Sequence, residues 1–180
     1  MFERAFKVIM LGDNAVGKTS LLNRYLRGEF KPEYVPTIKT GIYEKEFKFP
    51  NYIVRLMLWD LGDEREFNEI RKEYCADAQA AIIVYDVCRP SSFKSVDDWY
   101  RGIAESASDK PIIWLVGNKI DLEGNRLVDK GAVEKKTKEL GIGYMEVSAK
   151  MGENIEVLFT SILKDLIKAR LNGIRMWLRG

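Results

Sequence analysis

Short apolar runs of strand length recur along the chain and alternate with stretches of helical periodicity. Nearly continuous apolar runs are typical of strands that are buried on both faces of a parallel sheet. The segment 41–49 instead alternates between apolar and polar residues. Together with 52–59 across the pair Pro50-Asn51, it predicts an antiparallel hairpin. The expected strands cover residues 5–11, 41–49, 52–59, 80–85, 112–116 and 144–147.

Stretches with helical periodicity lie between these runs. One covers 20–27 and ends at Gly28, and another covers 132–140 and ends at Gly141, because glycine readily adopts the left-handed conformation of a helix C-terminus. A helix in the middle of the chain is expected to begin with Ser91 or Ser92 as its N-cap. The apolar faces of this helix and of a last helix are formed by Phe93, Val96, Trp99 and Ile103, and by Ile155, Leu158, Phe159, Ile162 and Leu166.

This alternation of strands and helices predicts an α/β fold. We expect a doubly wound, mostly parallel six-stranded sheet with helices on both faces. Ligands of such sheets bind beyond the carboxyl ends of the strands. The length of 180 residues favours a single domain, which we expect to span 1–172 and to be followed by a tail over 173–180.

Composition narrows the possible chemistry. The chain has no histidine, which excludes Ser-His-Asp and Cys-His catalysis and the usual zinc sites. Its net charge of +2 gives no electrostatic footprint for nucleic acid. Cys75 and Cys88 share no metal or redox spacing, and we expect both to be buried apolar side chains in a reducing compartment. No apolar run is long enough to span a membrane. We therefore expect a cytoplasmic protein, and peripheral attachment to a membrane stays open.

The strongest chemical signal follows the first expected strand. A strand, a glycine-bounded loop and a helix N-terminus together form an anion site, to which a lysine adds a full positive charge. We expect Lys18 to reach the β- and γ-phosphates of a nucleotide and the Thr19 hydroxyl to ligate Mg²⁺. The phosphate-binding pattern G-x-x-x-x-G-K-T and the residue after it are Gly12, Asp13, Asn14, Ala15, Val16, Gly17, Lys18, Thr19 and Ser20.

A second signal selects the base. Asn118, Lys119 and Asp121 form the pattern N-K-x-D directly after an expected strand. The Asp121 carboxylate can accept two hydrogen bonds from the N–H groups at guanine N1 and N2. Adenine lacks this pair of donors and would leave Asp121 unpaired in a desolvated pocket. The sequence therefore favours a guanine nucleotide over an adenine nucleotide enzyme such as a kinase.

Over about residues 5–168, these patterns make the chain resemble the Ras superfamily of small GTPases, nearest to its Rab and Ras branches. The segment 146–150 resembles the last guanine-contacting loop of that family. The resemblance implies that the Ala149 N–H meets guanine O6, that Ser148 and Lys150 belong to the same site, and that Phe30 packs on the face of the base. Rab-like character comes from Trp59, Ser92-Phe93 and Trp99.

The same resemblance implies two switch segments, over about 30–40 and 60–75. In the first, Tyr34 belongs to the nucleotide site, and Thr37 ligates Mg²⁺ through its hydroxyl and contacts the γ-phosphate through its N–H. The second begins at Asp60, which holds Mg²⁺ through a water molecule. GTP holds both segments through its γ-phosphate, and hydrolysis releases them.

The second switch departs from the family pattern D-x-x-G-Q. Without a gap, Asp63 falls on the glycine and Glu64 on the glutamine that orients the attacking water. An ionised glutamate accepts hydrogen bonds but cannot donate them, and it repels the γ-phosphate, although it could act as a base. Either Asp63 points away, or the loop shifts so that Gly62 takes the glycine's part. We expect hydrolysis to be slow or to use a different geometry. The alternative is that both residues are solvated charges in a mobile loop.

The resemblance implies a switch that binds Mg²⁺ and GTP and hydrolyses GTP to GDP, with Lys18, Thr37, Asp63 and Glu64 as the catalytic candidates. It also implies effector, exchange-factor and GTPase-activating proteins as partners at the switch segments. A scaffold that binds GTP without hydrolysing it is the main alternative. The sequence places no arginine in cis at the phosphates. The tail 173–180 lacks a lipidation cysteine. It is either a short membrane- or partner-binding segment, or a frayed end or further helical turn packed on the domain, and a missing lipidated extension is a third alternative.

Overall fold

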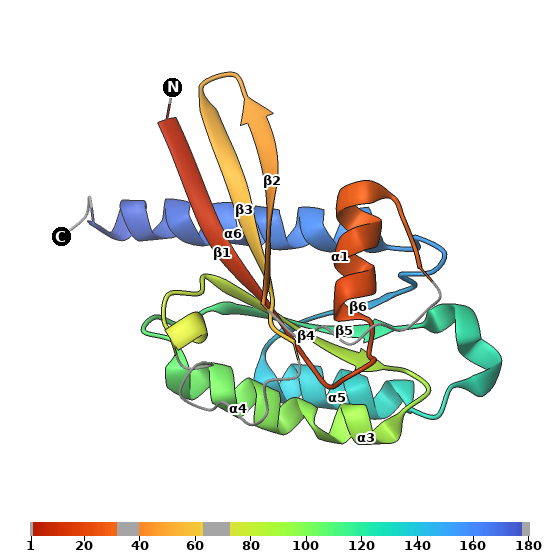
Figure 1. Ribbon diagram of the computed structural model, residues 1–180. Coiled ribbons are helices and arrows are strands. Elements are labelled where there is room, and N and C mark those ends of the chain that lie inside the picture. The colour runs from red at the N-terminus through yellow and green to blue at the C-terminus, as the bar shows by residue number, and fades with distance from the viewer. Residues whose placement is uncertain (1, 32–39, 63–72, 178–180) are drawn as a thin grey trace.

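The computed structural model describes residues 2–31, 40–62 and 73–177. Within these ranges six strands form one sheet in the order β2-β3-β1-β4-β5-β6 (Figure 1). β2 pairs antiparallel with β3, and all other neighbouring strands run parallel, which confirms the predicted mostly parallel sheet. The strands are β1 (Phe2–Leu11), β2 (Gly41–Phe49), β3 (Tyr52–Asp60), β4 (Ala80–Asp86), β5 (Ile112–Asn118) and β6 (Gly143–Val147).

Helices cover both faces of the sheet, as the sequence predicts. Figure 1 shows α1 and α6 on one face and α3, α4 and α5 on the other. Each layer buries its own apolar core, one around Phe159 and Leu21 and the other around Trp99 and Leu115. The central strand β4 is buried at every position because both of its faces are covered. The helices are α1 (Lys18–Arg27), α3 (Pro90–Lys94), α4 (Val96–Ser106), the 3₁₀ helix η1 (Ile120–Asn125), α5 (Lys130–Leu140) and α6 (Ile155–Trp177).

The helix ends test the expected capping. Gly28 and Gly141 end α1 and α5 in the left-handed conformation, at φ 70° and 64°, as predicted. The expected serine N-cap of the middle helix is wrong, because that helix starts after Arg89 with Pro90 at its first position, where the fixed φ of proline is preorganised for a helix. The Ser92 hydroxyl instead accepts a hydrogen bond from the Asp86 N–H at 3.0 Å.

Three further sequence expectations are refined. The middle helix is divided into α3 and α4 at Ser95, rather than being continuous. Cys75 is buried as expected, but Cys88 is only half-buried. α6 extends to Trp177, beyond the apolar face read from the sequence. The boundary expected between 172 and 173 lies within this helix, and it stays a prediction.

Parallel pairing brings one end of five strands to the same edge of the sheet. β1, β3, β4, β5 and β6 all run in one direction, so their carboxyl ends lie together. The order of the strands reverses around β1, and this switch point is where ligands of such sheets bind. The last residues of these strands are Leu11, Asp60, Asp86, Asn118 and Val147.

Candidate functional site

Five consecutive main-chain carbonyls in the loop after β1 accept hydrogen bonds from side chains. Lys18 Nζ donates to the first two, and three residues from other elements donate to the next three. Because the C=O and N–H of a peptide unit point in opposite directions, fixing these carbonyls also fixes the direction of the amide groups between them. The bonds are Lys18 Nζ to Gly12 O (2.7 Å) and Asp13 O (3.1 Å), Arg89 Nη2 to Asn14 O, Lys119 Nζ to Ala15 O (2.9 Å) and Asn118 Nδ2 to Val16 O (2.9 Å).

Two positions of this loop require glycine. Gly12 has a φ of 136°, and a Cβ atom there would lie 2.2 Å from the carbonyl oxygen of Val84. Gly17 has a φ of 98°, and its Cβ would lie 2.3 Å from Asn118 Nδ2. Gly17 is also the N-cap of α1, whose first turn carries no acidic residue. The loop therefore ends at a helix N-terminus that favours an anion.

Thr19 and Asp60 meet beside this helix N-terminus. Thr19 Oγ1 donates to Asp60 Oδ2 at 2.5 Å, and Asp60 is fully buried at the end of β3. Burial raises the pKa of Asp60, and the Thr19 hydrogen bond and the positive charge of Lys18 oppose this shift. The other carboxylate oxygen, Oδ1, has no hydrogen-bond partner among the described residues.

This pair fits a magnesium site. Mg²⁺ prefers oxygen ligands, retains several water molecules and is usually held by one or two protein carboxylates together with phosphates. A hydroxyl beside a buried carboxylate with one unused oxygen matches that preference. The third predicted ligand, Thr37, lies outside the described residues.

The residues of the predicted base site come together from two further strand ends. Asn118 Oδ1 accepts from the Ala149 N–H at 3.1 Å, so Asn118 bonds to both the loop 12–16 and the loop after β6. Asp121 Oδ1 accepts from Ser148 Oγ at 2.6 Å. Lys119 has a left-handed φ of 73°, a conformation that costs non-glycine residues about 1 kcal/mol or more and is concentrated at functional sites. Its ammonium also pairs with Asp86 at 2.6 Å.

The remaining predicted contact residues differ in exposure. Ser148 and Ala149 are buried, and Lys150 is exposed. Ser20 and Phe30 are half-buried, and Gly62 is buried two residues after Asp60. Tyr34, Asp63 and Glu64 lie outside the described residues, so the predictions that depend on them stay predictions.

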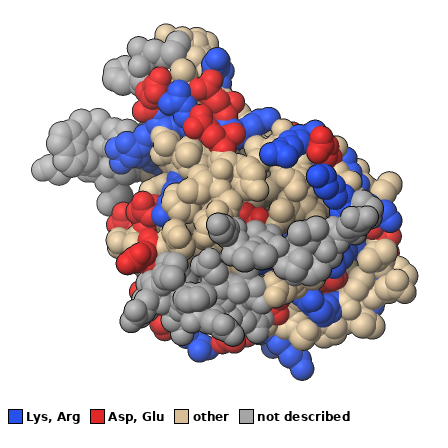
Figure 2. Space-filling model, viewed as in Figure 1, with Lys and Arg blue, Asp and Glu red and all other residues tan. Residues whose placement is uncertain are grey.

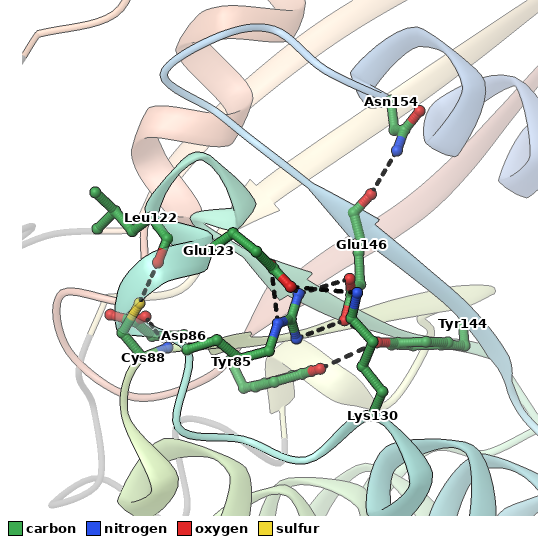
Figure 3. A network of polar contacts seen from close by, with 10 residues as sticks. Tyr85, Asp86, Cys88, Leu122, Glu123, Lys130, Tyr144, Glu146 and Asn154 are labelled. Atoms are coloured by element: carbon green, nitrogen blue, oxygen red, sulfur yellow. Dashed lines mark hydrogen bonds and ion pairs between the residues drawn. The ribbon is translucent and has the colours of Figure 1, made fainter.

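A polar network that sequence reasoning missed lies next to the base site and connects two of its segments (Figure 3). Arg126 follows η1 and donates two hydrogen bonds to Glu146, at 2.9 and 2.8 Å. Tyr144 OH donates to the same carboxylate at 2.6 Å and lies 3.2 Å from Tyr85 OH. Glu123 also bonds to Arg126, at 2.9 Å. The network joins the segment after Asp121 to the strand that leads to Ser148.

Burial and charge set the protonation of this network. Burial lowers the pKa of Arg126, but its hydrogen bonds to Glu146 and Glu123 outweigh this effect and raise the pKa overall. Burial raises the pKa of Tyr85 to about 12, and it also raises the pKa of Tyr144. Arg126 is therefore charged at neutral pH, while both phenols are neutral.

Comparison with known proteins gives consistent results. The family model described as "Ras family" matches residues 7–168. The chain is 36% identical over 166 residues to Ras-related protein Rab-26 of Bos taurus, covering 92% of this chain and 65% of that protein. The corresponding proteins of Homo sapiens and Rattus norvegicus are 36% and 35% identical over the same shares. The chain thus spans slightly less than two thirds of the length of these relatives. Within the described ranges, no helix combines the length and hydropathy needed to cross a bilayer.

Proposed function

The chain belongs to the Ras family as a Rab-like small GTPase, and we propose that it is a molecular switch that binds GTP and hydrolyses it to GDP and phosphate. The observation that carries this proposal is the joining of two patterns in one site. Asn118 and Lys119, from the base-selecting pattern, bond directly to the carbonyls of the phosphate loop. A ligand that spans both would have phosphates at one end and a purine at the other.

Phosphoryl transfer needs positioning and charge neutralisation more than covalent chemistry from the protein. Lys18, 7% exposed and held at the start of the loop, would contact the β- and γ-phosphates. Thr19, Asp60 and, as a prediction, Thr37 would hold Mg²⁺, which when bound neutralises charge on the β- and γ-phosphate oxygens. The oxygen of water would form a bond to the γ-phosphorus while the bond to the β–γ bridging oxygen breaks. GDP leaves with that electron pair, and the water proton passes to phosphate.

Base selection would rest on Asp121. Ser148 occupies one carboxylate oxygen of Asp121 and orients the group, while Arg24 fixes the following loop by donating to Ala149 O at 2.9 Å. The Ala149 N–H, which now donates to Asn118, is our candidate for guanine O6.

The first experiment identifies the bound nucleotide directly. Purified protein is denatured in acid, and the released nucleotide is separated by ion-exchange chromatography. We expect GDP or GTP at close to one equivalent, and conversion of loaded GTP to GDP over time when Mg²⁺ is present. If neither nucleotide is released and calorimetry detects no binding of either, the proposed function is wrong.

A second experiment tests the base assignment. Asp121→Asn places an amide donor where guanine offers donors, while xanthine offers an O2 acceptor. The variant should lose affinity for GDP and gain affinity for xanthosine diphosphate. Met151→Ala, at an exposed position after the same loop, is the control. Unchanged guanine preference in Asp121→Asn would contradict the assignment.

The departures at Asp63 and Glu64 favour a second candidate, a GTP-binding scaffold that does not hydrolyse its ligand. Single-turnover phosphate release separates the candidates. Faster release in Glu64→Gln than in the unsubstituted chain would mean that the chain is a switch whose hydrolysis of GTP is slowed by Glu64. Slower release would make Glu64 a working catalytic group. Absence of release from both proteins would support the scaffold.

Partner binding through the switch segments is the remaining part of the proposal. An apolar surface lies on the strands that connect these segments. Ile42 is 52% exposed and lies opposite Trp59 in the β2–β3 ladder, and the Tyr74 ring is 5.6 Å from Trp59. Figure 2 shows an area of uncharged side chains at the centre of its view, between charged residues. Effector, exchange-factor and GTPase-activating proteins are the proposed partners.

The cytoplasmic location stays a prediction that cell fractionation can test.

A further inference from the structure

Three side chains of the segment 89–99 form hydrogen bonds with the phosphate loop. Asp13, in the loop, is 8% exposed. Its carboxylate accepts from Ser95 Oγ at 3.0 Å and from Trp99 Nε1 at 2.9 Å. Arg89 Nη2 donates to the carbonyl of the next residue, Asn14. Two adjacent residues of the loop are therefore fixed by three side chains at the start of α3 and α4.

The charge on Asp13 makes these contacts consequential. A carboxylate within a loop that binds phosphates repels its ligand, and the repulsion is strong where water is excluded. The indole N–H lies on α4 and the serine hydroxyl lies at its N-cap, so the hydrogen bonds hold the carboxylate toward the start of that helix. Hydrogen bonds to a charged acceptor are stronger than those between neutral groups, so the two donors can fix its direction.

Arg89 has the opposite charge at the same loop. Its Nε atom is buried and has no hydrogen-bond partner among the described residues, which is an unfavourable arrangement for a donor. Nη2 donates to the loop, and this bond fixes a guanidinium beside the Asn14 carbonyl. Such a fixed cation attracts the phosphates and partly offsets Asp13. Sequence reasoning did not predict this contact, because arginine at position 89 belongs to no recognised pattern.

We propose that Arg89, Ser95 and Trp99 are positioning residues that determine how long the phosphate loop retains its nucleotide. The proposal rests on the proposed function, because it requires a bound guanine nucleotide. Loss of Trp99 or Ser95 removes a hydrogen bond that directs the Asp13 carboxylate toward the start of α4, and loss of Arg89 removes an attractive charge. Both changes accelerate release, and both act more strongly on GTP than on GDP because GTP carries more charge.

The test measures dissociation of N-methylanthraniloyl GDP, chased with excess GDP at fixed Mg²⁺ and salt. We expect Trp99→Phe to raise the dissociation rate about tenfold, which corresponds to about 1.4 kcal/mol. Arg89→Ala should raise it about fivefold, equivalent to about 1 kcal/mol, and Arg89→Lys should restore part of the loss. Higher salt should reduce the Arg89 effect, because salt screens charge.

Two control variants separate positioning from general destabilisation. Trp114→Phe removes another indole–carboxylate hydrogen bond, from Trp114 Nε1 to Asp165 at 3.2 Å, between β5 and α6. Lys94→Ala removes an exposed cation from α3, close to Arg89 in the sequence. Both controls should release the nucleotide within twofold of the unsubstituted rate, whatever their melting temperatures.

A rescue experiment isolates the charge. Asp13→Asn in the Trp99→Phe background replaces the carboxylate that has lost the indole donor with a neutral amide, so release should become slower than in Trp99→Phe alone. The inference is overturned if this double variant is as fast as the single one, or if Trp99→Phe and Arg89→Ala match the controls. If Trp99→Phe does not fold, the half-buried Arg89 still decides the outcome. An unsubstituted chain that binds no labelled GDP would overturn the proposed function as well, and this result is distinct from binding with unaltered release.

Discussion

The two ends of the candidate site differ in how their polar groups are satisfied. At the base end, protein groups pair with one another: Asp121 with Ser148, and Arg126 with Glu146. At the phosphate end, Asp60 is fully buried and one of its oxygens has no partner among the described residues. An unsatisfied buried carboxylate is costly, and a cation that reaches it relieves the cost. The base end should therefore contribute stability without a ligand, whereas the phosphate end should gain stability when one binds.

The largest expected effect comes from breaking the ion pair of the base end. Both side chains are mostly buried, at 12% exposure for Arg126 and 18% for Glu146. Arg126→Ala leaves the Glu146 carboxylate without its positive partner, although Tyr144 still donates to it, and should lower the free energy of unfolding by about 3 kcal/mol. Urea denaturation without nucleotide measures the change. Arg101→Ala, which removes a mostly exposed arginine from α4, is the control and should change stability little.

Replacing both partners distinguishes a pair from two separate contacts. Arg126→Met with Glu146→Leu removes both charges, and this double variant should be more stable than Arg126→Ala because no buried charge is left alone. A double variant that is no more stable than Arg126→Ala would mean that the network stabilises the chain mainly by packing.

The second prediction concerns the phosphate end. There the free energy of unfolding should depend on bound ligand, whereas at the base end it should not. Mg²⁺ and GDP at about one hundred times the dissociation constant should stabilise the chain by about 2.7 kcal/mol. Asp60→Asn removes a buried charge, so without ligand it should be neutral or slightly stabilising. With Mg²⁺ and GDP it should gain less than the unsubstituted chain. Melting temperatures with and without ligand measure both differences.

A matched result at the base end sharpens the comparison. Glu146→Gln should lower the melting temperature by a similar amount with and without Mg²⁺, because Glu146 pairs with Arg126 and not with the predicted magnesium ligands. If the gain from Mg²⁺ is the same in Asp60→Asn as in the unsubstituted chain, the phosphate end does not bind the ion as proposed.

The sequence predicted the parts of the site that depend on local pattern. A strand, the loop 12–19 and a helix follow one another in the chain. Asn118 follows the apolar run of β5 and ends that strand, so it lies at the same edge of the sheet. Glycine at positions 12 and 17 is required by backbone geometry, so the signal is strong. The fold class followed from the same alternation of strands and helices.

Contacts between distant segments were not predictable in this way. Arg89 and Asn14 are 75 residues apart, and Trp99 and Asp13 are 86 apart. Trp99 was read as a core side chain. It is one, but its indole N–H also bonds to the loop. Periodicity identifies the buried face of a helix and gives no information on the polar atom of an amphipathic side chain that lies there.

The third prediction concerns Asn118, which bonds to both ends of the site. Asn118→Asp keeps the oxygen that accepts from Ala149 and loses the donor to the Val16 carbonyl. It also places a charged oxygen against that carbonyl in a buried position, and should destabilise the chain by about 2 kcal/mol. Asn125→Asp, at an exposed position in η1, is the control. Equal urea midpoints for the two variants would contradict a structural role for Asn118 apart from nucleotide.

The smallest effect comes from the far end of the base-end network. Tyr85→Phe removes a buried hydroxyl that lies 3.2 Å from Tyr144 OH, and should cost about 1 kcal/mol at neutral pH.

Burial raises the pKa of Tyr85 from 10.0 to about 12. Above pH 10 the unfolded chain therefore loses this proton while the folded chain keeps it. Stability from this raised pKa is fully present below pH 10 and is lost as the pH rises toward 12. Tyr85→Phe should thus show a shallower loss of stability between pH 9 and pH 11 in urea denaturation. Tyr52→Phe, at an exposed position of β3, should leave the slope unchanged. A slope that stays the same in Tyr85→Phe would show that the base end does not hold this phenol neutral.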